Sequence, residues 1–452
     1  MASSSRPQPI AAASQPPRVF PTSGFRLINP SDRVEEEQLP FYKREDYYPM
    51  RMGEVVGEHY QVVAKLGYGA TSTVWLGRDL RDGKYWTLKV HINTLKHNQE
   101  RVVYRHLASV QDMGDHPGMQ HVRELHDSFT LTSQHGDHEV FVMTPLGMSL
   151  RTLQEMQPNH VFQKLLVTSS LNQVLIGLDY LHHAGVVHTG EYQNEDIACL
   201  CNSTIDKLNP TPDLHADNLL IAITDDAVLA DVEEGEILEP AARKQDGDRF
   251  VYVSRYMLGG AGPLTICDFG QARIGSEHTG PAMPLPYRAP EVILKMEWGS
   301  PVDLWTVGLL AWGLLEPKAL FDVYATESPE LNDACHLAAM TALLGPPPPE
   351  FLQRSEEAGK YWSEDGEHHS NVLSNTKPTS FVLTVLVSLG TWKGPVPVPT
   401  GVSLESLVTS LEGEDKGAFL DLLSGLLCWL PEERLAAAQA CRHAWLRGGG
   451  AE

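Results

Sequence analysis

Residues 263–291 read PLTICDFGQARIGSEHTGPAMPLPYRAPE, and they are the most informative part of the sequence. Its apolar beginning is typical of a buried strand, and the triplet DFG at 268–270 follows at once. A carboxylate at a strand end can bind Mg²⁺, which prefers oxygen ligands. Asp268 is therefore our first candidate metal ligand, and the triplet APE at 289–291 closes the stretch.

Upstream, the runs between Tyr60 and Ile92 are rich in β-branched and aromatic residues and are separated by glycine and aspartate. They predict an antiparallel sheet. Two of the predicted strands flank a glycine-rich turn, where glycine lets backbone amides approach phosphate oxygens. A plain β-turn is the alternative for this segment taken alone. The candidate nucleotide-binding residues here are Leu66, Gly67, Tyr68, Gly69, Ala70, Thr71, Ser72, Thr73 and Val74.

A lysine in the next predicted strand extends the pattern. Lys89 lies in WTLKV, where a cation can hold two phosphates and pair with a helix carboxylate, for which Glu100 is the candidate. The order of glycine turn, strand lysine, DFG and APE, with Asp303 and Arg434 beyond, matches the signature set of protein kinases. Because the joint spacing makes coincidence a poor explanation, we expect Lys89 and Glu100 to be catalytic residues that bind or position ATP.

The remaining chain predicts an α+β, bilobal protein-kinase fold. Apolar residues recur at helical spacing in 161–185 and again in 301–316. We expect a small antiparallel β-sheet N-lobe with one main helix and a larger, mostly α-helical C-lobe. The expected boundaries are a disordered or weakly ordered N-terminal tail at 1–45, and a kinase domain at 46–446. Within this domain we expect an N-lobe of about 46–146 and a C-lobe of about 147–446.

Composition restricts the partners and the compartment. The 58 acidic and 35 basic residues give a net charge of -23, which repels phosphate backbones and disfavours direct binding of nucleic acid. None of the six cysteines has CxxC spacing, so we expect neither a disulfide framework nor a zinc site. The apolar run at 304–315 is too short to span a membrane. We expect a cytoplasmic or nuclear protein, with a mitochondrial presequence at 1–27 as the alternative.

Three further stretches resemble the SR-protein kinase family, in particular its fungal, SRPK-like serine/threonine kinases. They are residues 47–75, 336–348 and 420–446. The resemblance implies a monomer that uses ATP and Mg²⁺ and phosphorylates basic, Arg/Ser-rich proteins, which an acidic enzyme would attract. It also implies that Met143 borders the adenine and that Leu146 supplies backbone hydrogen bonds to it. The acidic run at 231–239 is interpreted as a solvated surface, with substrate binding as the alternative.

The catalytic loop expected from this resemblance, HTDLxxxN, is interrupted. His188-Thr189 is followed by residues 190–212, and only then by DLHADN at 213–218. Because the spacing from Asp to Asn survives, the resemblance implies that Asp213 is the catalytic base and Asn218 a Mg²⁺ ligand. The role of His188 is left open by the interruption.

We hypothesise that residues 190–212 are a translated in-frame intron. A GT within the Gly190 codon and an AG across the Pro212–Asp213 boundary would bracket it, and its excision would restore HTDLHADN. The alternative is a genuine insert that weakens or regulates catalysis. A scaffolding pseudokinase is therefore a competing function, which is also favoured by His215 in place of a lysine. A small-molecule kinase is a third function, and the APE triplet weakens it because this segment supports peptide binding in protein kinases.

Overall fold

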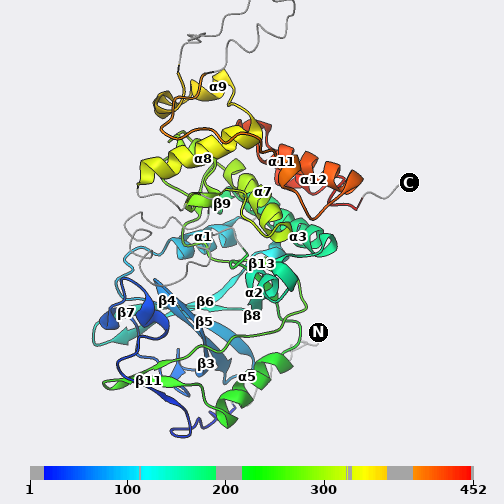
Figure 1. Cartoon of the computed structure of the whole chain (residues 1–452). Helices are drawn as coiled ribbons and strands as arrows, with labels where there is room; N and C mark the ends of the chain where they lie inside the picture. The colour runs from blue at the N-terminus through cyan, green and yellow to red at the C-terminus, as the bar shows by residue number, and fades with distance from the viewer. Residues whose placement is uncertain are drawn as a thin grey trace, which may run out of the picture. The chain divides into compact units, whose positions relative to one another are not determined.

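The computed structural model describes residues 15–110, 114–189, 216–321, 323, 328–363 and 390–448. The chain forms two compact units, and each is described by itself (Figure 1). The β-unit is made of Met1–Asn98, Arg123–Met148 and Ile221–Gly262. The helical unit is made of Gln99–Val122, Ser149–Leu220 and Pro263–Glu452.

The β-unit is organised around a six-stranded antiparallel sheet with the strand order β2-β3-β4-β5-β7-β6. The register places Gly67 opposite Val74, and Val74 opposite Lys89 on the other side. The predicted glycine-rich turn and the predicted lysine therefore lie on adjacent strands. The strands are β2 (Val55–Val56), β3 (Tyr60–Gly69), β4 (Ser72–Asp79), β5 (Tyr85–His91), β6 (Leu125–Ser133) and β7 (Gly136–Met143).

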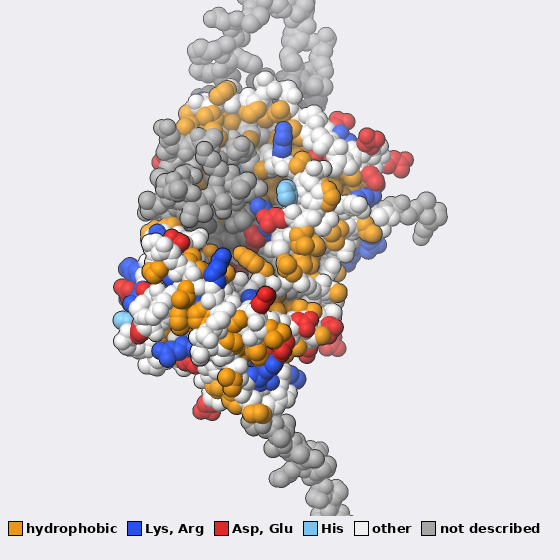
Figure 2. Space-filling view, turned by 60° about the horizontal axis from the view of Figure 1, so that its bottom comes forward, with side chains coloured by type: hydrophobic (Ala, Val, Ile, Leu, Met, Phe, Trp, Pro, Cys, Tyr) orange, Lys and Arg blue, Asp and Glu red, His pale blue; other side chains and the backbone are white. Residues whose placement is uncertain are grey.

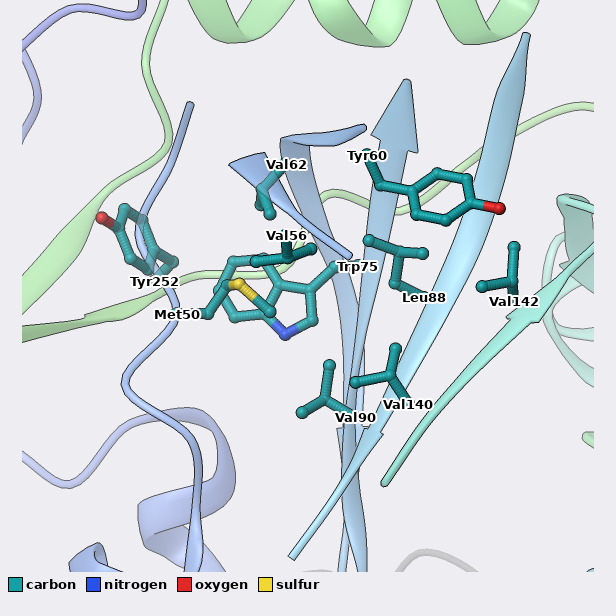
Figure 3. Packing of buried hydrophobic residues seen from close by; sticks show 10 residues of the cluster. All are labelled: Met50, Val56, Tyr60, Val62, Trp75, Leu88, Val90, Val140, Val142 and Tyr252. Atoms are coloured by element: carbon teal, nitrogen blue, oxygen red, sulfur yellow. The ribbon is translucent and has the colours of Figure 1, made fainter. Parts of the chain in front are cut away.

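One face of this sheet carries a core of buried apolar side chains (Figure 3). Trp75 of β4 and Leu88 of β5 pack with Tyr252, which comes from a segment more than a hundred residues further along the chain. Full burial of one such side chain stabilises the fold by about 1.5–3 kcal/mol. The cluster consists of Met50, Val56, Tyr60, Val62, Trp75, Leu88, Val90, Val140, Val142 and Tyr252.

Residues 221–262 fold onto the β-unit, although the boundaries expected from the sequence placed them in the C-lobe. They form helix α5 (Ala227–Leu238) and a hairpin of β11 (Arg243–Asp246) and β12 (Arg249–Tyr252). Leu229 of α5 packs against β3 in a second core cluster with Phe20. Conversely, helix α1 (Gln99–Ser109), the expected main helix of the N-lobe, belongs to the helical unit.

The N-terminal segment from residue 15 onward is also folded, which corrects the expectation of a weakly ordered tail over 1–45. Strand β1 (Leu27–Ile28) pairs with β11, and Phe20 is only 8% exposed. Two buried lysines explain the order, because each needs a carboxylate partner when it leaves water. Lys65 pairs with Glu36, and Lys244 pairs with Glu37 at 2.8 Å.

The acidic run at 231–239 lies largely in α5. Three of its five carboxylates, Asp231, Glu234 and Glu239, are exposed as the sequence suggested, but the other two are not solvated. Glu233 is 2% exposed and Glu236 is fully buried. Burying a charge is expensive unless it is paired, and both residues have basic partners within 3.4 Å. The partners are Arg18 and Arg78 for Glu233, and Arg243 and Arg255 for Glu236.

The helical unit contains the helices expected at 161–185 and 301–316, which are α3 (Lys164–His183) and α7 (Pro301–Leu315). Helix α7 is apolar on every side and almost wholly buried, as such a helix must be. The described helices include none with both the length and the apolar character of a bilayer-spanning segment. The other elements are α2 (Leu150–Glu155), β9 (Val186–Val187), β13 (Leu264–Ile266), β14 (Arg273–Ile274), α6 (Pro290–Ile293), α8 (Pro329–Leu344), α9 (Pro349–Leu352), α11 (Leu404–Leu407), α12 (Gly413–Leu426) and α13 (Ala437–Ala440). Strands β8 (Leu146–Ser149) and β10 (Leu219–Ala222) lie where the chain passes from one unit to the other.

Candidate active site

The glycine-rich turn connects β3 and β4 through Ala70-Thr71. A Cβ atom added at Gly67 or Gly69 would meet no atom within 4 Å, so the backbone of this turn has open space beside it. This is the condition for a close approach of phosphate oxygens to backbone amides. Lys89 is half-buried on β5. Within the β-unit, the structure thus fits a triphosphate along the turn.

The two side chains predicted to surround the adenine lie within the packed interior. Met143 at the end of β7 is fully buried, and Leu146 in β8 is 6% exposed. Their roles beside the base stay predictions. Glu100 of α1 is 3% exposed. Because Lys89 and Glu100 belong to different units, their ion pair also stays a prediction.

The helical unit brings together the two predicted Mg²⁺ ligands. Asp268 directly follows β13, and Asn218 directly precedes β10. The backbone N–H of Cys267 donates to the carbonyl oxygen of Asn218 at 2.9 Å, so both candidates adjoin one inter-strand hydrogen bond. The Asp268 side chain is exposed, and its oxygen chemistry suits a hard cation. These residues therefore fit Mg²⁺.

The backbone at Asp268 is unusual. Its φ is 63°, in the left-handed region that costs a non-glycine residue roughly 1–2 kcal/mol. The N–H of Gly270 donates to Asp268 Oδ1 at 3.2 Å, which gives this conformation a local partner. Asp217 directly precedes the other candidate ligand, Asn218. Burial raises the pKa of the Asp217 carboxyl, and the nearby positive charge of Arg151 opposes this effect.

His188, whose role the sequence left open, is a packing and hydrogen-bonding element. Its Nε2 lies 3.0 Å from the carbonyl oxygen of Cys267. Its ring lies 5.4 Å from that of Phe269, which in turn lies 5.5 Å from Tyr104 of α1. This row of three rings connects α1, the DFG triplet and the start of the catalytic loop. Sequence reasoning missed Tyr104, although its position four residues after Glu100 places both on one helix face.

Asp303 of α7 anchors the same part of the catalytic loop. Its Oδ2 accepts a hydrogen bond from the backbone N–H of His188, and its Oδ1 accepts one from Thr189, both at 2.9 Å. His182 Nε2 also lies 2.9 Å from Oδ2. Asp303 is 1% exposed, and Thr189 has a φ of 61°. The catalytic loop is therefore fixed in position as far as Thr189, the last residue before the interruption.

The APE triplet is bonded to Arg434, a residue of the signature set that lies near the end of the chain. Glu291 accepts two hydrogen bonds from Arg434, at 2.6 and 2.7 Å, and both side chains are buried. Arg434 also lies over the ring of Trp305, 5.1 Å from its centre. Such a bidentate pair fixes geometry as well as charge. It supports the segment that follows Asp268.

Part of the predicted site lies outside the described residues. This holds for the candidate base Asp213, for His215 and for the whole of 190–212. Their assignments stay predictions.

Another group of metal-type ligands occurs away from these residues. The candidate ligand atoms of His116, Asp179 and His183 lie within 4.8 Å of one another. However, the Gly118 N–H donates to Nδ1 of His116 at 3.0 Å, so a neutral His116 carries its proton on Nε2. That nitrogen faces Asp179 Oδ2 at 3.4 Å. The proton arrangement suits an imidazole–carboxylate contact better than a metal.

Comparison with known proteins agrees with this geometry. The protein kinase domain family matches residues 60–190 and 255–446. The chain is 35% identical to a serine/threonine protein kinase of Aspergillus fumigatus, over 96% of each chain. It is 31% identical to Serine/threonine-protein kinase SRPK of Physarum polycephalum, over 74% of this chain and 78% of that one. The match to the family leaves out 191–254, which contain Asp213 and Asn218.

A solved kinase domain supports the fold. It shares a TM-score of 0.59 and 20% identity with this chain, covering 89% of this chain and 100% of its own. The predicted bilobal kinase fold and the predicted phosphotransferase class are thereby confirmed. The chain belongs to the protein kinase family, as a serine/threonine protein kinase with SRPK-like relatives.

Proposed function

We propose that this kinase phosphorylates serine in basic, Arg/Ser-rich proteins, and that its catalytic form lacks residues 190–212. The observation that carries the second part is the anchoring on both sides of the interruption. Thr189 is bound by Asp303, while Ala216 accepts a hydrogen bond from the Arg151 N–H at 3.0 Å. Without 190–212, only Asp213, Leu214 and His215 would connect these two anchors.

The proposed mechanism is mainly positioning and electrostatics. Asp213 accepts the proton of the substrate hydroxyl, and Lys89 holds the α- and β-phosphates. Asp268 and Asn218 would hold Mg²⁺, which when bound would supply positive charge to the transferring group. The backbone amides around Gly67 and Gly69 orient the phosphates. Because the insert adjoins Asp213, its presence would disturb the base more than it would disturb ATP binding.

The substrate class rests on charge and on the relatives' names. The net charge of -23 favours encounter with a basic protein. Relatives include Serine/threonine-protein kinase SRPK of Physarum polycephalum and SRSF protein kinase 3 of Sus scrofa. On the face shown in Figure 2, acidic side chains are spread among basic and apolar ones. Glu233 and Glu236 are buried in ion pairs, so neither is available to bind a substrate.

The test compares the full chain with a variant that lacks residues 190–212, using an Arg-Ser repeat peptide and a peptide with alanine for each arginine. We expect the shortened chain to phosphorylate the basic peptide faster than the full chain does. In the shortened chain, Asp268→Asn should lower kcat by about a hundredfold or more, because it removes electrostatic stabilisation at the transferring group. Glu414→Gln, at an exposed carboxylate of α12, is the matched control and should leave kcat unchanged.

Three outcomes would contradict the proposal. Equal rates on both peptides would reject the substrate class. Binding of Mg·ATP without transfer to either peptide, in both forms of the chain, would favour the pseudokinase. Mature transcripts that all retain the codons for 190–212, together with equal activity of the two forms, would identify that segment as a genuine insert.

A further inference from the structure

The tip of the glycine-rich turn is tied to a tyrosine that lies outside the six-stranded sheet. The hydroxyl of Tyr47 is 3.2 Å from the carbonyl oxygen of Gly69 and 3.1 Å from that of Ala70. Both carbonyl groups can only accept, so the hydroxyl is the donor. Tyr47 is 6% exposed, and burial raises the pKa of its hydroxyl. The group therefore stays protonated, and remains a donor, at any pH at which the protein works.

Tyr47 is held from one side by the folded-back segment 221–262. Arg249 of β12 donates to the hydroxyl of Tyr42 at 2.5 Å, and to the carbonyl oxygens of Arg44 and Tyr47 at 2.8 and 3.4 Å. The rings of Tyr42 and Tyr47 lie 5.3 Å apart. One buried guanidinium thus fixes both the backbone and the ring environment of Tyr47.

The other side is held by the strand that carries Lys89. Asn93 follows β5, and its side-chain amide donates to the Glu45 carbonyl at 2.8 Å. Its backbone N–H donates to the carbonyl oxygen of Asp46 at 3.0 Å. The short 3-10 helix that precedes Tyr47, η2 (Arg44–Asp46), is therefore bracketed between Asn93 and Arg249. Tyr47 has a rigid base from which to hold the turn.

The pairing of β3 with β4 reaches Gly69 opposite Ser72, and beyond it few described contacts hold the tip of the turn. Gly67 and Gly69 have no neighbours where a side chain would be, and Ala70 and Thr71 are exposed. The Ile92 N–H donates to the Thr71 carbonyl at 3.0 Å, which holds one end of the tip. Glycine loses much conformational freedom when it becomes ordered, so a free turn would bind phosphates less tightly than a preordered one.

We propose that Tyr47 is a positioning residue for ATP, which holds the glycine-rich turn in its phosphate-binding conformation through the Gly69 and Ala70 carbonyls. Its support comes from Arg249, so that residues 221–262 act on nucleotide binding without touching the nucleotide. This inference rests on the proposed role of the turn in binding ATP. It assigns a function to a tyrosine that lies outside the glycine-rich turn, the DFG triplet and the APE triplet.

The test is Tyr47→Phe, which removes the hydroxyl and keeps the ring. Tyr48→Phe is the matched control, because its hydroxyl bonds to Glu54 Oε1 at 3.1 Å instead of to the turn. Hydrogen exchange of peptides covering residues 66–75, without nucleotide, should be faster in Tyr47→Phe and unchanged in Tyr48→Phe. The dissociation constant for Mg·ATP should rise about two- to tenfold, as expected for one hydrogen-bonding group. That for adenosine, which has no phosphates, should not change.

Unchanged exchange in Tyr47→Phe would overturn the proposal, as would equal weakening of ATP and adenosine, or the same effects in Tyr48→Phe. A thermal unfolding curve of each variant distinguishes a local release of the turn from general destabilisation. Arg249→Met serves as a second variant and should reproduce the faster exchange at 66–75. If the unmodified protein binds no nucleotide, the proposed ATP function fails, whereas the exchange measurement still decides whether Tyr47 holds the turn.

Discussion

Replacing Asp303 with asparagine is expected to loosen the first residues of the catalytic loop, His188 and Thr189. Oδ1 of Asp303 accepts from the Thr189 N–H, and Oδ2 accepts from the His188 N–H. Asparagine has the same shape but only one acceptor oxygen, so its NH₂ group must face one of these two donors. A hydrogen bond to a charged group contributes about 1.5–3 kcal/mol, and breaking a buried charged network costs about 3–5 kcal/mol. We therefore expect Asp303→Asn to lower the free energy of unfolding by about 1.5–5 kcal/mol.

The same substitution should lower catalysis through geometry. Thr189 is held with a φ of 61°, a conformation that costs roughly 1–2 kcal/mol and relaxes when its anchor weakens. A displacement of about 1 Å at the catalytic loop can lower the rate by about a hundredfold. The free energy of unfolding is measured by urea denaturation, and kcat is measured in the chain without residues 190–212.

The matched control is Asp421→Asn, because Asp421 also lies beside a histidine, with His443 Nε2 at 3.0 Å, but is 77% exposed. An exposed pair of this kind contributes at most about 1 kcal/mol. If Asp303→Asn changed neither the unfolding free energy nor kcat by more than its control does, the argument that this carboxylate holds the loop would be wrong.

Two further predictions concern buried charge. Glu236→Ala should lower the free energy of unfolding by about 3–5 kcal/mol, because Arg243 loses its buried partner, whereas Glu234→Ala, at an exposed position of the same helix, should cost under about 1 kcal/mol. Equal urea midpoints for these two variants would contradict this. Burial, with a smaller contribution from Arg288, lowers the pKa of His336 to about 3. When the pH is below 6.5, the ordinary pKa of histidine, His336 is protonated in the unfolded chain but stays neutral in the folded chain. The free energy of unfolding therefore decreases as the pH is lowered from about 6.5 to about 3, by about 1.4 kcal/mol per pH unit. In His336→Phe, the free energy of unfolding measured by urea denaturation should change less between pH 7 and pH 5 than in the unmodified protein. The same pH dependence in both proteins would show that His336 does not titrate in this way.

The sequence predicted the family, the order of the strands that carry the turn and Lys89, and the helices α3 and α7. It did so because these features depend on local patterns. A glycine-rich hairpin, an alternating strand and an apolar helix each have a period that is visible in a few consecutive residues. The short, spaced triplets at 268–270 and 289–291 then supplied the chemistry. The candidate metal ligand Asp268 came from the first of these triplets, whereas Asn218 was implied by the resemblance of the catalytic loop to that of the SR-protein kinase family.

Only the folded structure shows which charged side chains from distant parts of the sequence pair with one another. The carboxylates of 231–239 had the composition of a solvated surface, yet Glu236 is buried against Arg243 and Arg255. Residues 15–45 had the composition of a tail, yet Glu36 pairs with the buried Lys65. The support of the glycine-rich turn by Tyr47 also joins distant segments. Local periodicity does not show which charged side chains will pair, because a charge that becomes buried on folding needs a partner wherever the fold places it.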